Sequence, residues 1–240
     1  MKKAFGISAL VMASAFSAHV AAESVSNYQV QFTSQAPVID GTGNDAVWQS
    51  AKTLTQFSFP WRTQMAPATE FKALWDTNAM YFRYRVEDKQ LAVGTDPERA
   101  ILDSDRVEIF LAKDVGLSQY YTMEIDAKSR VFSGKAAYDT AMKKRTALDS
   151  TWQWPGLVAK ASLTETGYVV EGSLPLKTLD ALGLWQDSAK TTLLCALMRA
   201  EFTPQPNGKI DMGWMTWVDP NTPKPNFHNP GTFGTCTFTQ

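Results

Sequence analysis

Alternation of apolar and polar residues with a period of two recurs along this chain and constrains its fold more than any other feature. The clearest case is the stretch 103–111, in which Val107, Ile109 and Leu111 alternate with Arg106, Glu108 and Phe110. This pattern predicts a strand with its first set in a core and its second set on the opposite face. A carboxylate in mid-strand lowers sheet propensity, so Glu108 is a candidate functional residue. The alternative is an ordinary solvated outer face.

Strand signals recur elsewhere, whereas helix signals are rare. We expect further strands at 56–61, 69–75, 80–86, 119–125, 158–163, 168–174, 191–201 and 233–239. One short helix is expected at 176–182, ended by Gly183, and residues 133–150 are expected to be irregular. The sequence therefore predicts an all-β fold, an antiparallel β-sandwich of jelly-roll type with one short helix.

The first 22 residues have the three parts of a signal peptide. Lys2 and Lys3 precede an apolar run at 4–16, and Val20–Ala22 form a small-residue cleavage site. We therefore expect a single mature domain at 23–240, located in the periplasm or secreted. No later run approaches 18 apolar residues, so no transmembrane anchor is expected.

Charge and histidine count exclude several function classes. The net charge is −1 and no stripe of Lys or Arg is present, which argues against a nucleic-acid partner. His228 is the only histidine outside the expected signal peptide, so zinc sites with several histidines and bis-histidine haem are excluded. His228 itself lies in a Pro-rich stretch, where a hydrogen-bonded loop residue is the alternative to a functional one.

The chain has two cysteines, Cys195 and Cys236, both on expected strands. An exported chain meets an oxidising compartment, so we predict that they form a disulfide. Two buried free thiols remain the alternative, because spacing alone does not place their Cα atoms within bridging distance.

Polar residues of several expected strands could share one face of a sheet. If the strands at 80–86, 103–111 and 119–125 are neighbours, that face carries Arg83, Arg85, Glu108, Thr122 and Glu124. Arg199 ends a buried strand, where an arginine needs a partner, and Glu108 or Glu124 would serve.

Six motifs in order resemble the carbohydrate-binding module family 9-like proteins over essentially the whole mature chain. They are Ile39–Gly41 with Asp45 and Trp48, Leu74–Asp76 with Met80–Phe82, Asp105–Phe110, Trp154–Gly156, Gly167–Glu171 with Pro175, and Trp217 with Phe227–Pro230 and Phe233–Gly234. The resemblance implies a β-sandwich that binds a glycan, often its reducing end, on one face. It also implies structural Ca²⁺.

Residue by residue, Glu108 matches the acidic residue that bonds the sugar in this family. The well-studied modules hold the sugar between two tryptophans, and the matching positions here hold Leu102 and Phe227. Trp61, beside Arg62, is a candidate for the missing platform.

The sequence thus predicts a non-catalytic, monomeric glycan-binding protein, with no cofactor beyond a candidate structural Ca²⁺. The predicted ligand-binding residues are Trp61, Arg83, Glu108, Glu124, Arg199, Phe227 and His228. One alternative is a glycoside hydrolase, which needs two carboxylates about 5 to 9.5 Å apart; Asp103, Asp105, Glu108 and Glu124 are available. The other is a periplasmic haem-binding electron carrier of the same sandwich type, with Met198, Met212 or Met215 as ligands.

Overall fold

A computed structural model of the chain describes Met1 and residues 26–185 and 191–240. The expected signal peptide lies outside the described residues except for Met1. Within the described part, no helix is long and apolar enough to cross a membrane.

The described residues form a β-sandwich with little helix. The strands are β1 (Asn27–Phe32), β2 (Thr69–Trp75), β3 (Ala79–Glu87), β4 (Arg106–Ala112), β5 (Tyr120–Asp126), β6 (Val131–Asp139), β7 (Lys144–Asp149), β8 (Val158–Leu163), β9 (Gly167–Pro175), β10 (Thr191–Pro204), β11 (Ile210–Thr216) and β12 (Gly234–Thr239). The helices are α1 (Leu176–Ala181) and two short 3₁₀ turns, η1 (Ala46–Gln49) and η2 (Pro230–Thr232). The predicted short helix and the predicted sandwich are both confirmed.

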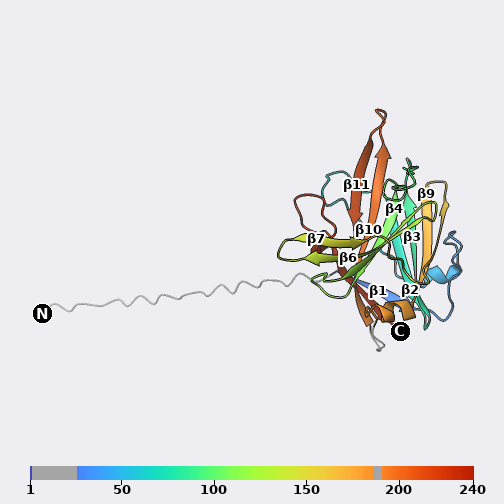
Figure 1. Ribbon diagram of the computed structural model, residues 1–240. Helices are drawn as coiled ribbons and strands as arrows, with labels where there is room; N and C mark the ends of the chain where they lie inside the picture. The colour runs from blue at the N-terminus through green and yellow to red at the C-terminus, as the bar shows by residue number, and fades with distance from the viewer. Residues whose placement is uncertain (2–25, 186–190) are drawn as a thin grey trace.

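All strands belong to one sheet that folds back on itself. Its order is β7-β6-β5-β4-β10-β12-β1-β2-β3-β9-β8, with β11 paired to β10. We call β4–β7, β10 and β11 the front layer, and β1–β3, β8 and β9 the back layer; β12 joins them. In Figure 1 the long β10–β11 hairpin rises beyond the rest of the sandwich, and the β6–β7 hairpin projects from its side.

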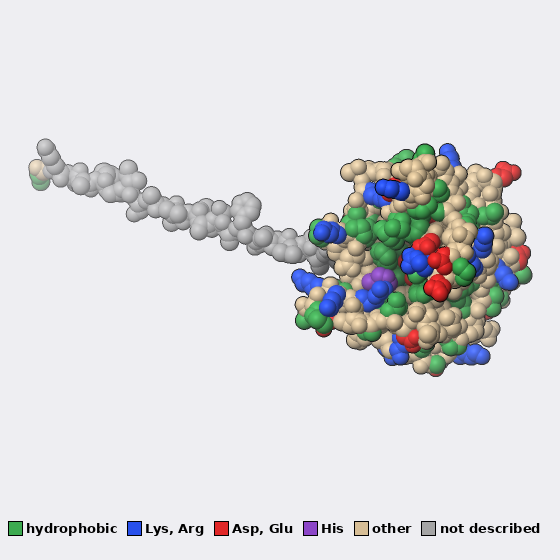
Figure 2. Space-filling model, turned by 45° about the horizontal axis from the view of Figure 1, so that its top comes forward, with side chains coloured by type: hydrophobic (Ala, Val, Ile, Leu, Met, Phe, Trp, Pro, Cys, Tyr) green, Lys and Arg blue, Asp and Glu red, His purple; other side chains and the backbone are tan. Residues whose placement is uncertain are grey.

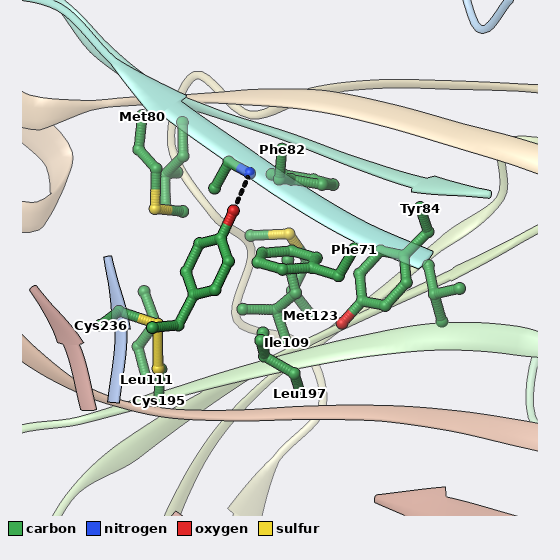
Figure 3. Packing of buried hydrophobic residues seen from close by; sticks show 14 of the residues in the cluster. Phe71, Met80, Phe82, Tyr84, Ile109, Leu111, Met123, Cys195, Leu197 and Cys236 are labelled. Carbon is green, nitrogen blue, oxygen red and sulfur yellow. Dashed lines mark hydrogen bonds between the residues drawn. A yellow bond between two sulfur atoms is a disulfide. The ribbon is translucent and has the colours of Figure 1, made fainter. Parts of the chain in front are cut away.

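The main core lies between the two layers. Alternate residues of each strand point into it, as the period-2 pattern predicts. Figure 3 shows Phe82 and Tyr84 of β3 facing Ile109 of β4 and Leu197 of β10 across this core. All four side chains are buried, so the apolar set of β4 lies in the core and its second set faces away.

The two layers join where β10, β12 and β1 lie side by side. Cys195 of β10 and Cys236 of β12 form a disulfide there, with their Cα atoms 6.0 Å apart. The pairs that β1 makes with β12 and with β2 are both parallel, and the remaining strand pairs of the sheet are antiparallel.

Three local expectations were wrong. Residues 133–150 are not irregular, because most of them form the β6–β7 hairpin. Every residue of β7 is exposed, so this strand has no buried face and no apolar alternation to reveal it. Residues 56–61 are not a strand, since Ser58 makes only an isolated bridge to Thr216. The strands β1 and β11 were missed.

Candidate functional site

The outer face of the front layer carries a buried cluster of charged side chains. Glu108 of β4 lies directly opposite Glu124 of β5 in the sheet register. Arg106 Nε donates to Glu124 Oε2 at 2.6 Å, and Arg106 Nη2 lies 3.0 Å from Glu108 Oε1. The Arg106 guanidinium also lies over the ring of Phe202, 5.6 Å from its centroid. All three charged residues are buried. The alternative interpretation of Glu108, a residue on an ordinary solvated outer face, is therefore wrong.

Glu108 is the most unusual member of this cluster. Loss of solvation raises the pKa of its carboxyl group to about 8; repulsion from Glu124 adds to the rise and Arg106 opposes it. Glu108 Oε1 has the guanidinium of Arg106 as its ion-pair partner, whereas the buried Oε2 has no hydrogen-bond partner among the described residues. A buried oxygen without a partner is costly, so Glu108 holds hydrogen-bonding capacity that a ligand could use.

Aromatic rings from the segment that follows β11 pack on the same face as this cluster. The His228 ring lies between Phe110 and Phe227, with centroid distances of 5.0 and 4.8 Å. Phe227 in turn lies 5.8 Å from Trp214 of β11. Figure 2 shows hydrophobic side chains gathered beside a histidine and a group of acidic and basic side chains on this side of the molecule. The face therefore combines flat apolar surfaces with charged hydrogen-bonding groups.

His228 is held in place by polar contacts at both ring nitrogens. Nδ1 lies 3.0 Å from the Tyr120 hydroxyl, and Nε2 lies 3.3 Å from Nη1 of Arg145 on β7. Loss of solvation first, and then the charges of Arg145 and Arg106, lower the pKa of His228 to about 3. The imidazole is therefore neutral near pH 7 and accepts from Arg145 at Nε2.

The structure does not bring Arg83 to this face. Arg83 lies on β3 in the back layer, where Nη1 donates to the Gly43 carbonyl at 2.8 Å and the guanidinium pairs with Glu70. It also lies over the Trp48 ring, 5.6 Å from its centroid. The shared polar face required β3 to neighbour β4, and this condition is not met, because β3 pairs with β2 and β9.

Arg199 is also separated from Glu108. It pairs with Glu201, lies 3.9 Å from Asp88 Oδ2, and donates to Thr69 Oγ1 at 3.0 Å. The expected pairing with Glu108 or Glu124 was wrong because Arg199 lies opposite Val107, on the inward side of β10.

Trp61 lies away from the Glu108 face, in a groove of its own. Its Nε1 donates to the Thr222 carbonyl at 2.9 Å, and the groove is also lined by Arg62 and Asp211. Of the predicted ligand-binding residues, Glu108, Glu124, Phe227 and His228 therefore share one face, whereas Trp61, Arg83 and Arg199 lie elsewhere.

The three candidate haem-ligating methionines have different surroundings. Met215 lies in the main core, Met198 packs in the smaller cluster around Phe110, and Met212 is half exposed on the hairpin. The three methionine side chains therefore do not converge on one common haem site.

A second acidic cluster fits the chemistry of a hard cation. One carboxylate oxygen from each of Asp88, Asp105 and Glu201 lies within 4.8 Å of the others. Asp88 Oδ2 is buried without a hydrogen-bond partner among the described residues. Loss of solvation is the largest cause that raises the pKa of Asp105 to about 8 and that of Glu201 to about 7. Three carboxylates beside the single guanidinium of Arg199 would suit Ca²⁺, which prefers oxygen ligands.

Sequence reasoning missed four residues of the candidate site. Arg106 could have been found, since it shares the outward alternation with Glu108. The alternation of residues 119–125 puts Tyr120 on the same face as Glu124, but its contact with His228 depends on how distant strands pair, as do the positions of Trp214 and Arg145.

Comparisons with known proteins agree with this architecture. Residues 39–240 match the family model described as carbohydrate family 9 binding domain-like. Two solved structures of a family 9 carbohydrate-binding module from Caldicellulosiruptor kristjanssonii, with cellotriose and with glucose, superpose with TM-scores of 0.63 and 0.62. Both are 18% identical and cover 89% of this chain, and 94% and 96% of theirs. The exoglucanase XynX of Acetivibrio thermocellus is 27% identical over 186 residues, which are 77% of this chain but only 15% of that protein.

Proposed function

Since the chain belongs to the carbohydrate family 9 binding domain-like family, we propose that it binds carbohydrate on the outer face of its front layer. Glu108 accepts hydrogen bonds from sugar hydroxyls or donates one to them, depending on its protonation. Arg106, which is itself fixed by Glu124, holds Glu108 in place. Phe227 and Trp214 provide apolar surfaces for the C–H faces of the sugar. The protein acts as a binding module and not as a catalyst.

One observation supports this proposal most directly: the buried carboxyl group of Glu108 has one oxygen, Oε2, without a hydrogen-bond partner among the described residues. A rigid strand positions this group, and a sugar hydroxyl is a neutral partner that can satisfy it at little electrostatic cost. A few convergent polar groups beneath aromatic side chains are typical of small-ligand sites.

Phe227 and His228 pack on the same face of the front layer as Glu108, where the His228 ring contacts Phe110. Both residues lie outside the strands, in the segment that connects β11 to η2. Glu108 is 1% exposed, so the side chains around it must move for a hydroxyl to reach the carboxyl group.

A glycan array followed by calorimetry tests the proposal. Wild-type protein should bind a defined set of glycans, and Glu108→Ala should weaken that binding by about 1 to 3 kcal/mol because it removes a buried hydrogen-bonding group. The Arg106–Glu124 pair stays intact in this variant, so we expect its melting temperature not to fall.

The matched control is Glu165→Ala, which removes an exposed carboxylate from the turn between β8 and β9. Its affinity should equal that of the wild type. Undiminished affinity in Glu108→Ala would remove Glu108 from the site. Hydrolysis of a bound glycan that Glu108→Ala abolishes would replace the binding function with a glycoside hydrolase.

We also propose that the protein is exported. The pattern of Lys2, Lys3 and Val20–Ala22 supports this proposal, as does the disulfide between Cys195 and Cys236, because disulfides persist in oxidising compartments. Cleavage after Ala22 would leave Glu23 as the first residue, which N-terminal sequencing of the mature protein can check.

A further inference from the structure

We propose a second carbohydrate contact in the groove around Trp61, so that the protein binds chains of several sugars better than single sugars. This inference rests on the proposed function. The groove has a volume of about 730 Å³ and is lined by Pro60, Trp61, Arg62, Asp211, Thr222 and Pro223. It is separate from the first site, because Asp211 and Trp214 have opposite parity along β11 and point to opposite faces.

The indole of Trp61 is anchored along one edge. Its Nε1 donates to the Thr222 carbonyl at 2.9 Å and lies 3.1 Å from the Thr222 hydroxyl. Pro60 and Pro223 line the same groove with backbones that have little freedom. The ring is half-buried, so a fixed aromatic surface is available for the C–H face of a pyranose.

A planar pair of charged groups lines the groove beside this ring. Arg62 Nη1 and Nη2 donate to the two carboxylate oxygens of Asp211 at 2.9 and 2.8 Å. The Arg62 guanidinium also packs over the ring of Phe59, 5.4 Å from its centroid, and this contact restricts the arginine side chain.

This pair can also bind hydroxyl groups. The Asp211 side chain is 50% exposed, and each of its oxygens has a further lone pair that can accept a hydrogen bond. Bidentate groups in one plane match the spacing of neighbouring sugar hydroxyls. The two charges cancel within the pair, which favours a neutral sugar over a charged one.

One backbone segment connects the two sites. Thr222 and Pro223 line the groove, and Phe227 and His228, a few residues later, cover the Glu108 face. Among the named strands β11 pairs only with β10, so its other edge beside Asp211 is not covered by a strand. A single sugar fits one site at a time, whereas a longer chain that passes over this edge can contact both faces, which increases its apparent affinity through the high effective concentration of the second contact.

The test compares glucose with cellohexaose by calorimetry on the full chain. Wild type should bind cellohexaose more tightly than glucose. Trp61→Ala should weaken cellohexaose binding about fivefold to tenfold, because one stacking contact is lost, and leave glucose binding within about twofold. Asp211→Asn, an exposed change that breaks the charged pair, should have the same selective effect and serves if Trp61→Ala does not fold.

Phe32→Ala is the matched control, since it removes an exposed aromatic ring from β1, outside both sites. It should leave both affinities unchanged. Unchanged cellohexaose affinity in both Trp61→Ala and Asp211→Asn would overturn the second contact. So would an equal loss of glucose and cellohexaose binding. In either case, loss of binding in Glu108→Ala would still support the first site. Wild-type protein that binds neither sugar would overturn this inference, and an empty glycan array would then count against the proposed function itself.

Discussion

The carboxyl group of Glu108 couples the stability of the protein to pH. Its pKa is about 8 in the folded protein, against about 4.3 for an unperturbed glutamate. Between these values the folded state holds a proton that the unfolded state releases, so stability falls as pH rises through this window. The raised pKa values of Asp105 and Glu201 act in the same direction.

We therefore expect the melting temperature to fall between about pH 5.5 and pH 8.5 in EDTA. One group contributes at most about 1.4 kcal/mol per pH unit. Glu108→Gln keeps the shape without the charge and should reduce the slope, whereas Glu165→Gln should not. A melting temperature that rises with pH, or an unchanged slope in Glu108→Gln, would contradict this assignment.

The segment that contains η1 is fastened to the back layer by one buried side chain. Glu171 of β9 accepts from the Trp48 indole Nε1 at 2.8 Å and from the Gly41 backbone N–H at 2.9 Å. Gly41 has φ of 90° and lies against the Ala161 backbone, so a larger residue would be strained there. The motif residues Ile39–Gly41, Trp48 and Glu171 therefore have a structural role, because they attach this segment to the back layer.

Trp48→Phe should therefore destabilise the protein by about 1 to 3 kcal/mol, since it leaves one oxygen of a buried carboxylate without its donor. Urea denaturation measures this difference. Trp152→Phe, at a half-buried position, should cost less. A loss for Trp48→Phe no larger than that for Trp152→Phe would show that Glu171 finds another partner.

For the molecule as a whole, a bound cation would neutralise the cluster of Asp88, Asp105 and Glu201. We expect Ca²⁺ to raise the melting temperature and EDTA to lower it, because an ion that binds only the folded state stabilises it. The effect should grow with pH, since the cation competes with protons on Asp105 and Glu201.

Asp88→Asn should abolish this shift, and Asp149→Asn, an exposed change on β7, should preserve it. Identical melts in Ca²⁺ and EDTA, on wild-type protein shown by elemental analysis to be metal-free beforehand, would remove the cation site.

The sequence by itself determined the features that depend on local periodicity. Alternation placed Val107, Ile109 and Leu111 in the core and Glu108 on the opposite face, and the motif order was sufficient to identify the family. A strand without a buried face, such as β7, could not be predicted, because exposed residues show no alternation of apolar and polar side chains.

Only the tertiary structure showed which strands are neighbours. The strand neighbours in turn determine which side chains come together at the candidate site. Arg83 and Arg199 have suitable chemistry but point elsewhere, whereas Trp214 and Arg145 reach Phe227 and His228 from the two hairpins. Strand order is set by pairing between residues far apart in the chain. Periodicity specifies the face on which a side chain lies, but it carries no information about the strand beside it.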